Sequence, residues 1–231
     1  MPLLIRSICR MSDLRLVIFD VDGTLVDSQA EILAAMTHAF AAEGRAMPDR
    51  SDVLSIVGLS LDVAFSRLCP DVDQAAQARL VEGYKDAFST QRAQNADHGP
   101  LYPGARAVLD TLAAQDNTLL AVATGKSRRG LDKLLERHAL EGFFHSEQVA
   151  DHHPSKPNPS MILTAMNELG VAQNRAVMVG DTTYDMDMAR AAGVAKIGVG
   201  WGYHAADLLM PDILIHEFGA LPDAVDELAG H

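Results

Sequence analysis

Two carboxylates, Asp20 and Asp22, lie two residues apart near the start of the chain. They follow an apolar run over residues 14–19, which is typical of a buried strand, and they precede Gly23. In an extended chain, side chains two residues apart lie on the same side. Carboxylates held that close repel each other unless a cation lies between them or one of them keeps its proton. This stretch therefore indicates a metal ion, an acid/base pair, or both.

Four further polar residues lie at or beside the ends of later predicted strands: Thr124, Lys156, Asp181 and Asp185. In an open parallel sheet, ligands bind beyond the carboxyl ends of the strands. We therefore expect the two early acids, a hydroxyl, an ammonium and two more acids to converge on one crevice.

This set of groups suits phosphoryl transfer. The acids offer the oxygen ligands that Mg²⁺ prefers, and Lys156 would neutralise charge on a phosphate. One carboxylate can attack phosphorus, while a second can protonate the leaving oxygen and later activate water. The hydroxyl of Thr124 and backbone N–H groups near Gly125, at the start of a predicted helix, can hold the remaining phosphate oxygens.

The order of elements predicts an α/β fold. From residue 103 onward, helical patterns alternate with short apolar strands, which is the signature of a doubly wound, Rossmann-like parallel sheet. Between residues 31 and 99 no strand pattern occurs. We therefore predict a catalytic core over residues 11–28 and 101–231, interrupted by an all-α cap over 29–100. Our hypothesis is that Met11 is the natural start or that residues 1–10 are a dispensable N-terminal extension.

The individual elements are predicted from hydrophobic periodicity and from Gly and Pro punctuation. Strands are expected at residues 14–19, 119–123, 143–149, 176–179, 195–199 and 212–215. Helices are expected at residues 29–43, 51–56, 60–68, 73–92, 105–114, 127–138, 160–169, 183–192 and 220–228.

Bulk properties exclude several classes of protein. With 48% hydrophobic and 22% charged residues, the composition is that of an ordinary globular protein. The net charge of −12 argues against nucleic-acid or anionic membrane partners. Cys9 and Cys69 show no paired spacing, and no apolar run approaches the roughly 20 residues of a membrane span. We therefore expect a cytoplasmic protein. Its oligomeric state, monomer or homodimer, stays open at this point.

The ordered motifs resemble those of the haloacid dehalogenase superfamily. They are Asp20-x-Asp22-Gly-Thr-Leu-x-Asp-Ser, then Thr124, then Lys156-Pro157, then Gly180-Asp181-x-x-x-Asp185. The helical insert resembles that superfamily's cap of the first type. Three further stretches resemble the phosphoglycolate phosphatases within it: Tyr102-Pro103-Gly104, Thr124-Gly125-Lys126 and Gly200-Trp201-Gly202-Tyr203. The chain departs from the pattern at Gly125, where relatives often carry Asn.

The resemblance implies a role for each matching residue. Asp20 would be the nucleophile, Asp22 the general acid/base, and Thr124 and Lys156 the catalytic phosphate holders. The expected substrate-binding residues are Gly23, Thr124, Gly125 and Lys156. The expected Mg²⁺ site comprises Asp20, Asp22 through its backbone carbonyl, Asp181 and Asp185. The implied activity is Mg²⁺-dependent hydrolysis of a small phosphorylated metabolite through an aspartyl-phosphate.

Several alternatives stay open at this point. A phosphomutase or a pyrophosphatase would use the same core, and a phospho-receiver domain uses a similar acidic cluster without the insert. The acid at Asp22 disfavours a dehalogenase, because dehalogenase members lack an acid there. Asp185 could instead be a first-turn helix acid. The spacing of His145, His152 and His153 does not suit zinc.

Three aromatic and loop features have no role assigned by the motifs alone. The loop over residues 57–60 is a candidate for facing the substrate, since a cap needs a loop that faces the core. Trp201 and Tyr203 could either pack or contact the ligand.

Overall fold

The computed structural model describes residues 14–94 and 99–230. The proposed extension over residues 1–10 and the start at Met11 lie outside the described residues. Within the described part of the chain, no helix is both long and apolar enough to cross a membrane.

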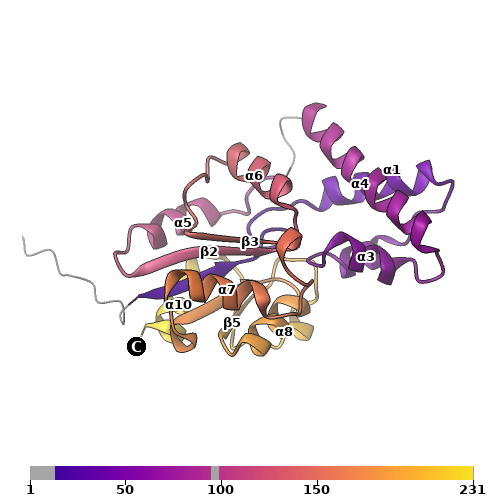
Figure 1. The fold of residues 1–231 in the computed structure, drawn as a ribbon. Helices are drawn as coiled ribbons and strands as arrows, with labels where there is room; N and C mark the ends of the chain where they lie inside the picture. The colour runs from indigo at the N-terminus through magenta and orange to yellow at the C-terminus, as the bar shows by residue number, and fades with distance from the viewer. Residues whose placement is uncertain (1–13, 95–98, 231) are drawn as a thin grey trace, which may run out of the picture.

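A six-stranded sheet forms the centre of the molecule (Figure 1). Its strands are β1 (Arg15–Phe19), β2 (Thr118–Thr124), β3 (Ser146–Val149), β4 (Ala176–Gly180), β5 (Ala195–Val199) and β6 (Ile213–Ile215). Their order is β3-β2-β1-β4-β5-β6, and every pair is parallel. The predicted doubly wound α/β core is confirmed.

Helices cover both faces of this sheet, as a parallel sheet requires. They are α5 (Ala105–Ala113), α6 (Arg128–Arg137), α7 (Ser160–Leu169), α8 (Thr183–Ala192), α9 (Ala206–Leu209) and α10 (Leu221–Ala229). On β1, Val17 and Phe19 join one core cluster with α5, α6 and α10, while Leu16 and Ile18 join another with α7 and α8. The alternation of strand side chains therefore fills two separate apolar layers.

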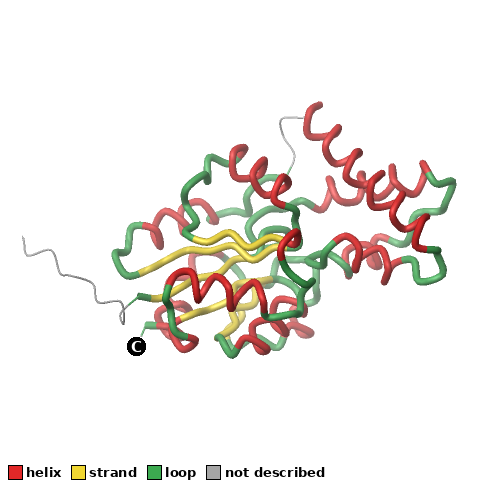
Figure 2. The backbone as a smooth tube through the Cα atoms, viewed as in Figure 1, coloured by secondary structure: helices red, strands yellow, loops and turns green. Residues whose placement is uncertain are grey.

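Four further helices form the insert after β1: α1 (Gln29–Ala42), α2 (Arg50–Ser55), α3 (Leu61–Leu68) and α4 (Gln74–Gln94). Figure 2 shows this part of the chain as helices without strands, set to one side of the sheet. The predicted apolar stripe of α1, which includes Ile32, Met36 and Phe40, is buried in a third core cluster. Phe40 also stacks on Phe65 of α3, with ring centroids 6.2 Å apart. The predicted helical cap is confirmed, whereas its outer bounds, 29 and 100, stay a prediction.

The two chain segments that join core and cap run side by side. Val26 forms isolated bridges with Asp22 and with Leu101. The N–H of Asp27 donates to the carbonyl of Pro100 over 2.9 Å. The cap is therefore connected to the core at a point four residues from Asp22.

The predicted bounds of the α-helices and strands agree with the structure within two residues, except at two places. The third strand begins at Ser146 and not at residue 143, and Phe144 before it packs in the same apolar cluster as α6. Helix α9 was not predicted, since its four residues are too few to show a helical period.

Candidate active site

Asp20, Asp181 and Asp185 meet at the carboxyl ends of the adjacent strands β1 and β4. Each of the three residues is at most 1% exposed, and their carboxylate oxygens lie within 4.8 Å of one another. The ammonium of Lys156 lies 2.8 Å from Asp20 Oδ1 and 2.6 Å from Asp185 Oδ1. The structure thus places Asp20 beside Asp181 and Asp185, which follow it by more than 160 positions in the sequence.

The charges in this cluster do not balance, because three buried carboxylates face one ammonium. Burial raises the pKa of Asp20 to about 7, with repulsion from Asp185 and Asp22 adding to it and the charge of Lys156 opposing it. Burial and the same kind of repulsion raise the pKa of Asp181 well above its usual value. For Lys156, burial alone would lower the pKa, but the two carboxylates outweigh it and raise the pKa.

The cluster fits a divalent cation. Neither oxygen of Asp20 accepts a hydrogen bond, although Oδ1 has its ion pair with Lys156. A hard cation, which prefers oxygen ligands, would give the Asp20 oxygens a partner and would offset the excess negative charge. Asp20, Asp181 and Asp185 are therefore the side chains that could hold a metal.

Asp185 also orients Lys156 and begins helix α8. Its Oδ1 accepts the hydrogen bond from Lys156, while its Oδ2 accepts from the N–H of Thr182 over 3.0 Å. Thr182 Oγ1 in turn accepts from the N–H of Asp185, which completes a capping box. Asp185 therefore both caps helix α8 and lies in the acidic cluster, while its role as a metal ligand stays a prediction.

Asp181 is held by groups that come from distant parts of the chain. Thr24 Oγ1 donates to Oδ1 over 2.9 Å, and the N–H of Tyr203 donates to Oδ2 over 2.8 Å. Gly23 and Gly202 lie against the same carboxyl: a Cβ on either glycine would come within 2.5 Å of an Asp181 atom. The sequence did not indicate the roles of Thr24 and Gly202.

Replacing Gly23 with Ala will displace Asp181. Gly23 has φ +82°, and a Cβ there would lie 2.2 Å from Asp181 Oδ2. A displacement of about 1 Å in a catalytic site costs on the order of 100-fold in rate, so we expect a loss of that size in kcat/KM. The matched control is Gly142→Ala, which has φ +76° and no atom within 4 Å of its Cβ. Equal losses in the two variants would contradict the proposed role of Gly23.

The carboxylate of Asp22 is held apart from the three-acid cluster. Ser28 Oγ donates to its Oδ1, and Lys126 Nζ lies 2.9 Å from the same oxygen. Tyr203 Oη lies 3.2 Å from Ser28 Oγ and accepts from the N–H of Ser28 over 3.1 Å. The side chain of Asp22 is therefore oriented by the first residues of the cap connection and by the loop after β2.

Thr124 ends β2 and is buried, and its Oγ1 accepts from the N–H of Lys126 over 3.2 Å. The neighbouring Gly125 contacts the cap, since a Cβ there would lie 2.6 Å from the carbonyl oxygen of Gly58. The N–H of Ser60 donates to Ser155 Oγ over 2.9 Å. The cap loop over residues 57–60 therefore faces the core next to Thr124 and Lys156.

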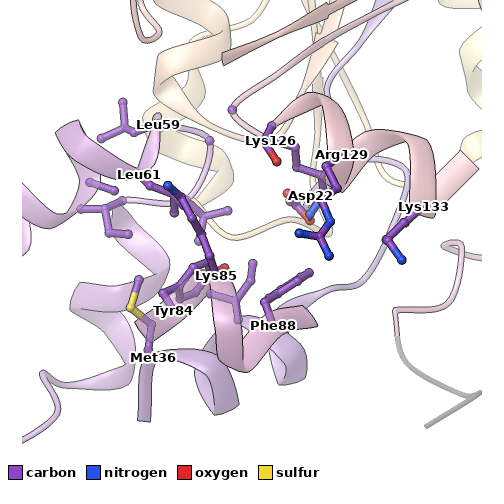
Figure 3. Close-up of a pocket in the computed structure, with 17 residues that line it drawn as sticks. Asp22, Met36, Leu59, Leu61, Tyr84, Lys85, Phe88, Lys126, Arg129 and Lys133 are labelled. Carbon is purple, nitrogen blue, oxygen red and sulfur yellow. The ribbon is translucent and has the colours of Figure 1, made fainter. Parts of the chain in front are cut away.

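A cavity of about 190 Å³ lies between the cap and the core beside Asp22 (Figure 3). The cap loop contributes Val57, Gly58 and Leu59 to its lining, and the core contributes Gly125 and Lys126. The expectation that this loop faces a substrate is consistent with its position.

Trp201 and His153 have structural contacts. Trp201 packs on Phe218 and donates through Nε1 to the carbonyl of Thr24 over 3.2 Å, so it supports the loop that holds Asp181. His153 bonds to Gln148 and Ser160. Among the described residues, the group able to hold a metal contains no histidine.

Comparison with known proteins identifies the family. A family model described as haloacid dehalogenase-like hydrolase matches residues 17–199. A Dickeya dadantii protein named "Probable phosphatase IndB" is 38% identical over 92% of this chain and 94% of its own length. A phosphoglycolate phosphatase of Agrobacterium fabrum is 33% identical over 92% of each chain.

A solved structure shows the same fold. The crystal structure of a hydrolase from Pseudomonas syringae superposes with a TM-score of 0.81, at 24% identity, over 93% of this chain and 99% of that one. The family match covers more than half of the chain and includes the strands that carry Asp20, Thr124 and Asp181. The chain therefore belongs to the haloacid dehalogenase-like hydrolases and is a phosphatase of that family.

Proposed function

We propose that this phosphatase is a Mg²⁺-dependent phosphomonoester hydrolase that acts through an aspartyl-phosphate on a small phosphorylated metabolite. The observation that carries the proposal is the buried cluster at the ends of β1 and β4. There, three buried carboxylates lie together, one lysine pairs with Asp20 and Asp185, and neither oxygen of Asp20 accepts a hydrogen bond. Such a carboxylate is free to bond to phosphorus.

Asp20 is the nucleophile in this proposal. A bond forms between a carboxylate oxygen of Asp20 and phosphorus as the bond from phosphorus to the ester oxygen breaks. Lys156, fixed between Asp20 and Asp185, compensates negative charge on the transferred phosphoryl group. Thr124 Oγ1 lies at the neighbouring strand end and supplies a donor to a phosphoryl oxygen.

Asp22 is the general acid and base. In the first step it gives a proton to the ester oxygen, so that the alcohol leaves neutral. In the second step it takes a proton from water as the water oxygen attacks phosphorus. The bond between phosphorus and the Asp20 oxygen breaks, which releases inorganic phosphate and restores the Asp20 carboxylate. Ser28 and Lys126 hold its carboxylate in one orientation for both steps.

Asp20, Asp181 and Asp185 would hold the Mg²⁺ ion, together with the backbone carbonyl of Asp22. When bound, the ion supplies positive charge that offsets the charge of the phosphoryl oxygens and of the buried acids. The protein contributes to this site by fixing the carboxylate of Asp181, which accepts hydrogen bonds from Thr24 Oγ1 and from the N–H of Tyr203.

A phosphate-release assay tests the proposal. We expect Mg²⁺-dependent release of phosphate from p-nitrophenyl phosphate and from 2-phosphoglycolate, the substrate class suggested by the Agrobacterium relative. Excess EDTA should stop the release. Formation of an isomerised sugar phosphate in place of free phosphate would indicate a mutase, and failure to hydrolyse any phosphomonoester would contradict the proposal.

Mg²⁺ should stabilise the folded protein more at pH 8 than at pH 5. The pKa of Asp20 is raised in the folded state, so its burial costs stability as the pH rises from about 4 to about 7. Below about pH 7 the folded protein keeps a proton on Asp20, and this proton competes with the cation. At Mg²⁺ about 100-fold above its Kd, binding adds about 2.7 kcal/mol, or roughly 5–10 °C in Tm.

Thermal unfolding with and without Mg²⁺ measures this difference. The control is Asp181→Asn, which removes one of the acidic side chains and should reduce the shift in Tm at pH 8. An equal shift in Tm at both pH values, or none at pH 8, would count against a metal site at these acids.

A further inference from the structure

The cavity beside Asp22 is basic in an acidic protein. Four of its lining residues are cationic, Lys85, Lys126, Arg129 and Lys133, while Asp22 is its one acid. The whole chain, in contrast, has 19 basic and 31 acidic residues. Lys156, the proposed phosphate holder, is not part of this lining. The positive charge of the cavity is therefore additional to the charge that serves the transferred phosphate.

Two of these cations are available to a ligand. Lys126 is paired with Asp22 at 2.9 Å, and Lys85 with Glu82 at 2.7 Å. Arg129 and Lys133 have no ion-pair partner among residues 14–94 and 99–230. They are four residues apart on α6, so they lie on the same face of the helix. In Figure 3 both extend from α6 at the side of the cavity opposite the cap.

The cap side of the same cavity is apolar. Met36, Leu61, Tyr84 and Phe88 line it from helices α1, α3 and α4. The Phe88 ring lies 5.1 Å from Lys126 Nζ, in a cation–π contact. A ligand in this space would have apolar surface on one side and cations on the other.

We propose that the substrate is a phosphomonoester whose organic part has an apolar body and carries a second anionic group. This rests on the proposed function, in which the phosphate occupies the site of Asp20 and Lys156 and the organic part enters the cavity. The apolar body would pack against Met36 and Phe88, and the second anion would pair with Arg129 and Lys133. A glycolate group supplies the second charge but no apolar body, so it would leave the cap wall in contact with water.

Three compounds separate the two features. Phenyl phosphate has the apolar body, 2-phosphoglycolate has the second anion, and 4-carboxyphenyl phosphate has both. We expect kcat/KM for 4-carboxyphenyl phosphate to exceed that for either of the others by roughly tenfold, the size expected for a charged hydrogen bond at a partly exposed site. Equal or lower values for 4-carboxyphenyl phosphate would overturn the proposal.

Variants of Arg129 and Lys133 test whether these two cations cause the preference for the carboxylated substrate. In the double variant Arg129→Gln/Lys133→Gln, the ratio of kcat/KM for 4-carboxyphenyl phosphate to that for phenyl phosphate should fall toward one. The control is Arg190→Gln, which removes a cation from α8 whose side chain is 74% exposed and does not line the cavity. A ratio that is unchanged in the double variant would overturn the assignment.

Binding without turnover distinguishes this inference from the proposed function. In Asp20→Asn, titration calorimetry should give roughly tenfold tighter binding of 4-carboxyphenyl phosphate than of phenyl phosphate. If the variant shows this tighter binding but the wild-type protein hydrolyses neither compound, the proposed specificity of the cavity is supported and the proposed reaction is overturned. Hydrolysis of both compounds by the wild-type protein, with equal binding in the variant, would retain the reaction and overturn the specificity.

Discussion

Asp20→Asn is expected to abolish turnover while the protein stays folded. The amide cannot form the acyl phosphate, so kcat should fall by about 10⁴-fold or more, as in enzymes that lose a covalent nucleophile. The fold should tolerate the change, because it removes a carboxylate whose burial, together with repulsion from Asp185 and Asp22, raises its pKa. Phosphate release and thermal unfolding, measured on the same preparation, check both parts.

The matched control for this variant is Asp27→Asn. Asp27 lies in the same loop but is exposed, and its carboxylate contacts only the N–H of Gln29, over 3.3 Å, in the described structure. Near wild-type turnover is expected from this control. Retained turnover by Asp20→Asn, in material shown by mass spectrometry to be free of deamidated protein, would refute the role of Asp20.

Lys156→Met is expected to cost both stability and activity. Its ammonium is fully buried and pairs with Asp20 and Asp185, so its loss leaves the acidic cluster without a counter-charge. Breaking a buried ion pair in this way typically costs about 3–5 kcal/mol. Denaturant unfolding without metal should show a loss of this size at pH 8.

The pH dependence of that loss identifies its cause. Protonation of Asp20 and Asp181 at low pH removes the uncompensated charge, so the difference from wild type should be smaller at pH 5 than at pH 8. The control is Lys196→Met, whose amine lies 3.7 Å from the partly exposed Asp212 and should cost at most about 1 kcal/mol. A Lys156→Met variant as stable as this control would show that the lysine does not balance the cluster.

Much of the core could be predicted from the sequence because its signals are local. Strand β5 and helices α7 and α8 begin and end where the apolar pattern and the following Gly residues place them. The convergence of Asp20, Thr124 and Asp181 follows from topology alone, since parallel strands present their carboxyl ends at one edge. The pattern therefore predicted both the sheet and the edge that carries the acids.

The supports of the site could not be predicted in the same way. Asp181 is held by Thr24 and by the N–H of Tyr203, and the sequence spacing of these residues has no period. The requirement for Gly202 arises from the close approach of two loops, which only the folded chain shows. The pairing of Lys126 with Asp22 likewise depends on how the loop after β2 packs against the loop after β1.

The cap shows the same limit. Its helices follow from apolar stripes such as that of Ile32, Met36 and Phe40, which are local. The surface that it presents to the site depends on the tertiary contacts between Gly58 and Gly125 and between Ser60 and Ser155. Helical periodicity places these residues in a loop and contains no information about which core residue they contact.

Covalent catalysis at Asp20 is tested most directly by trapping the intermediate. The protein is mixed with substrate and Mg²⁺, quenched during turnover, treated with borohydride to reduce any acyl phosphate, and digested for mass spectrometry. Conversion of Asp20 to homoserine is expected when substrate is present and not when it is omitted. Asp22 and Asp181 should give no such product. Full turnover with Asp20 unmodified, or modification of another carboxylate in its place, would contradict the aspartyl-phosphate at Asp20.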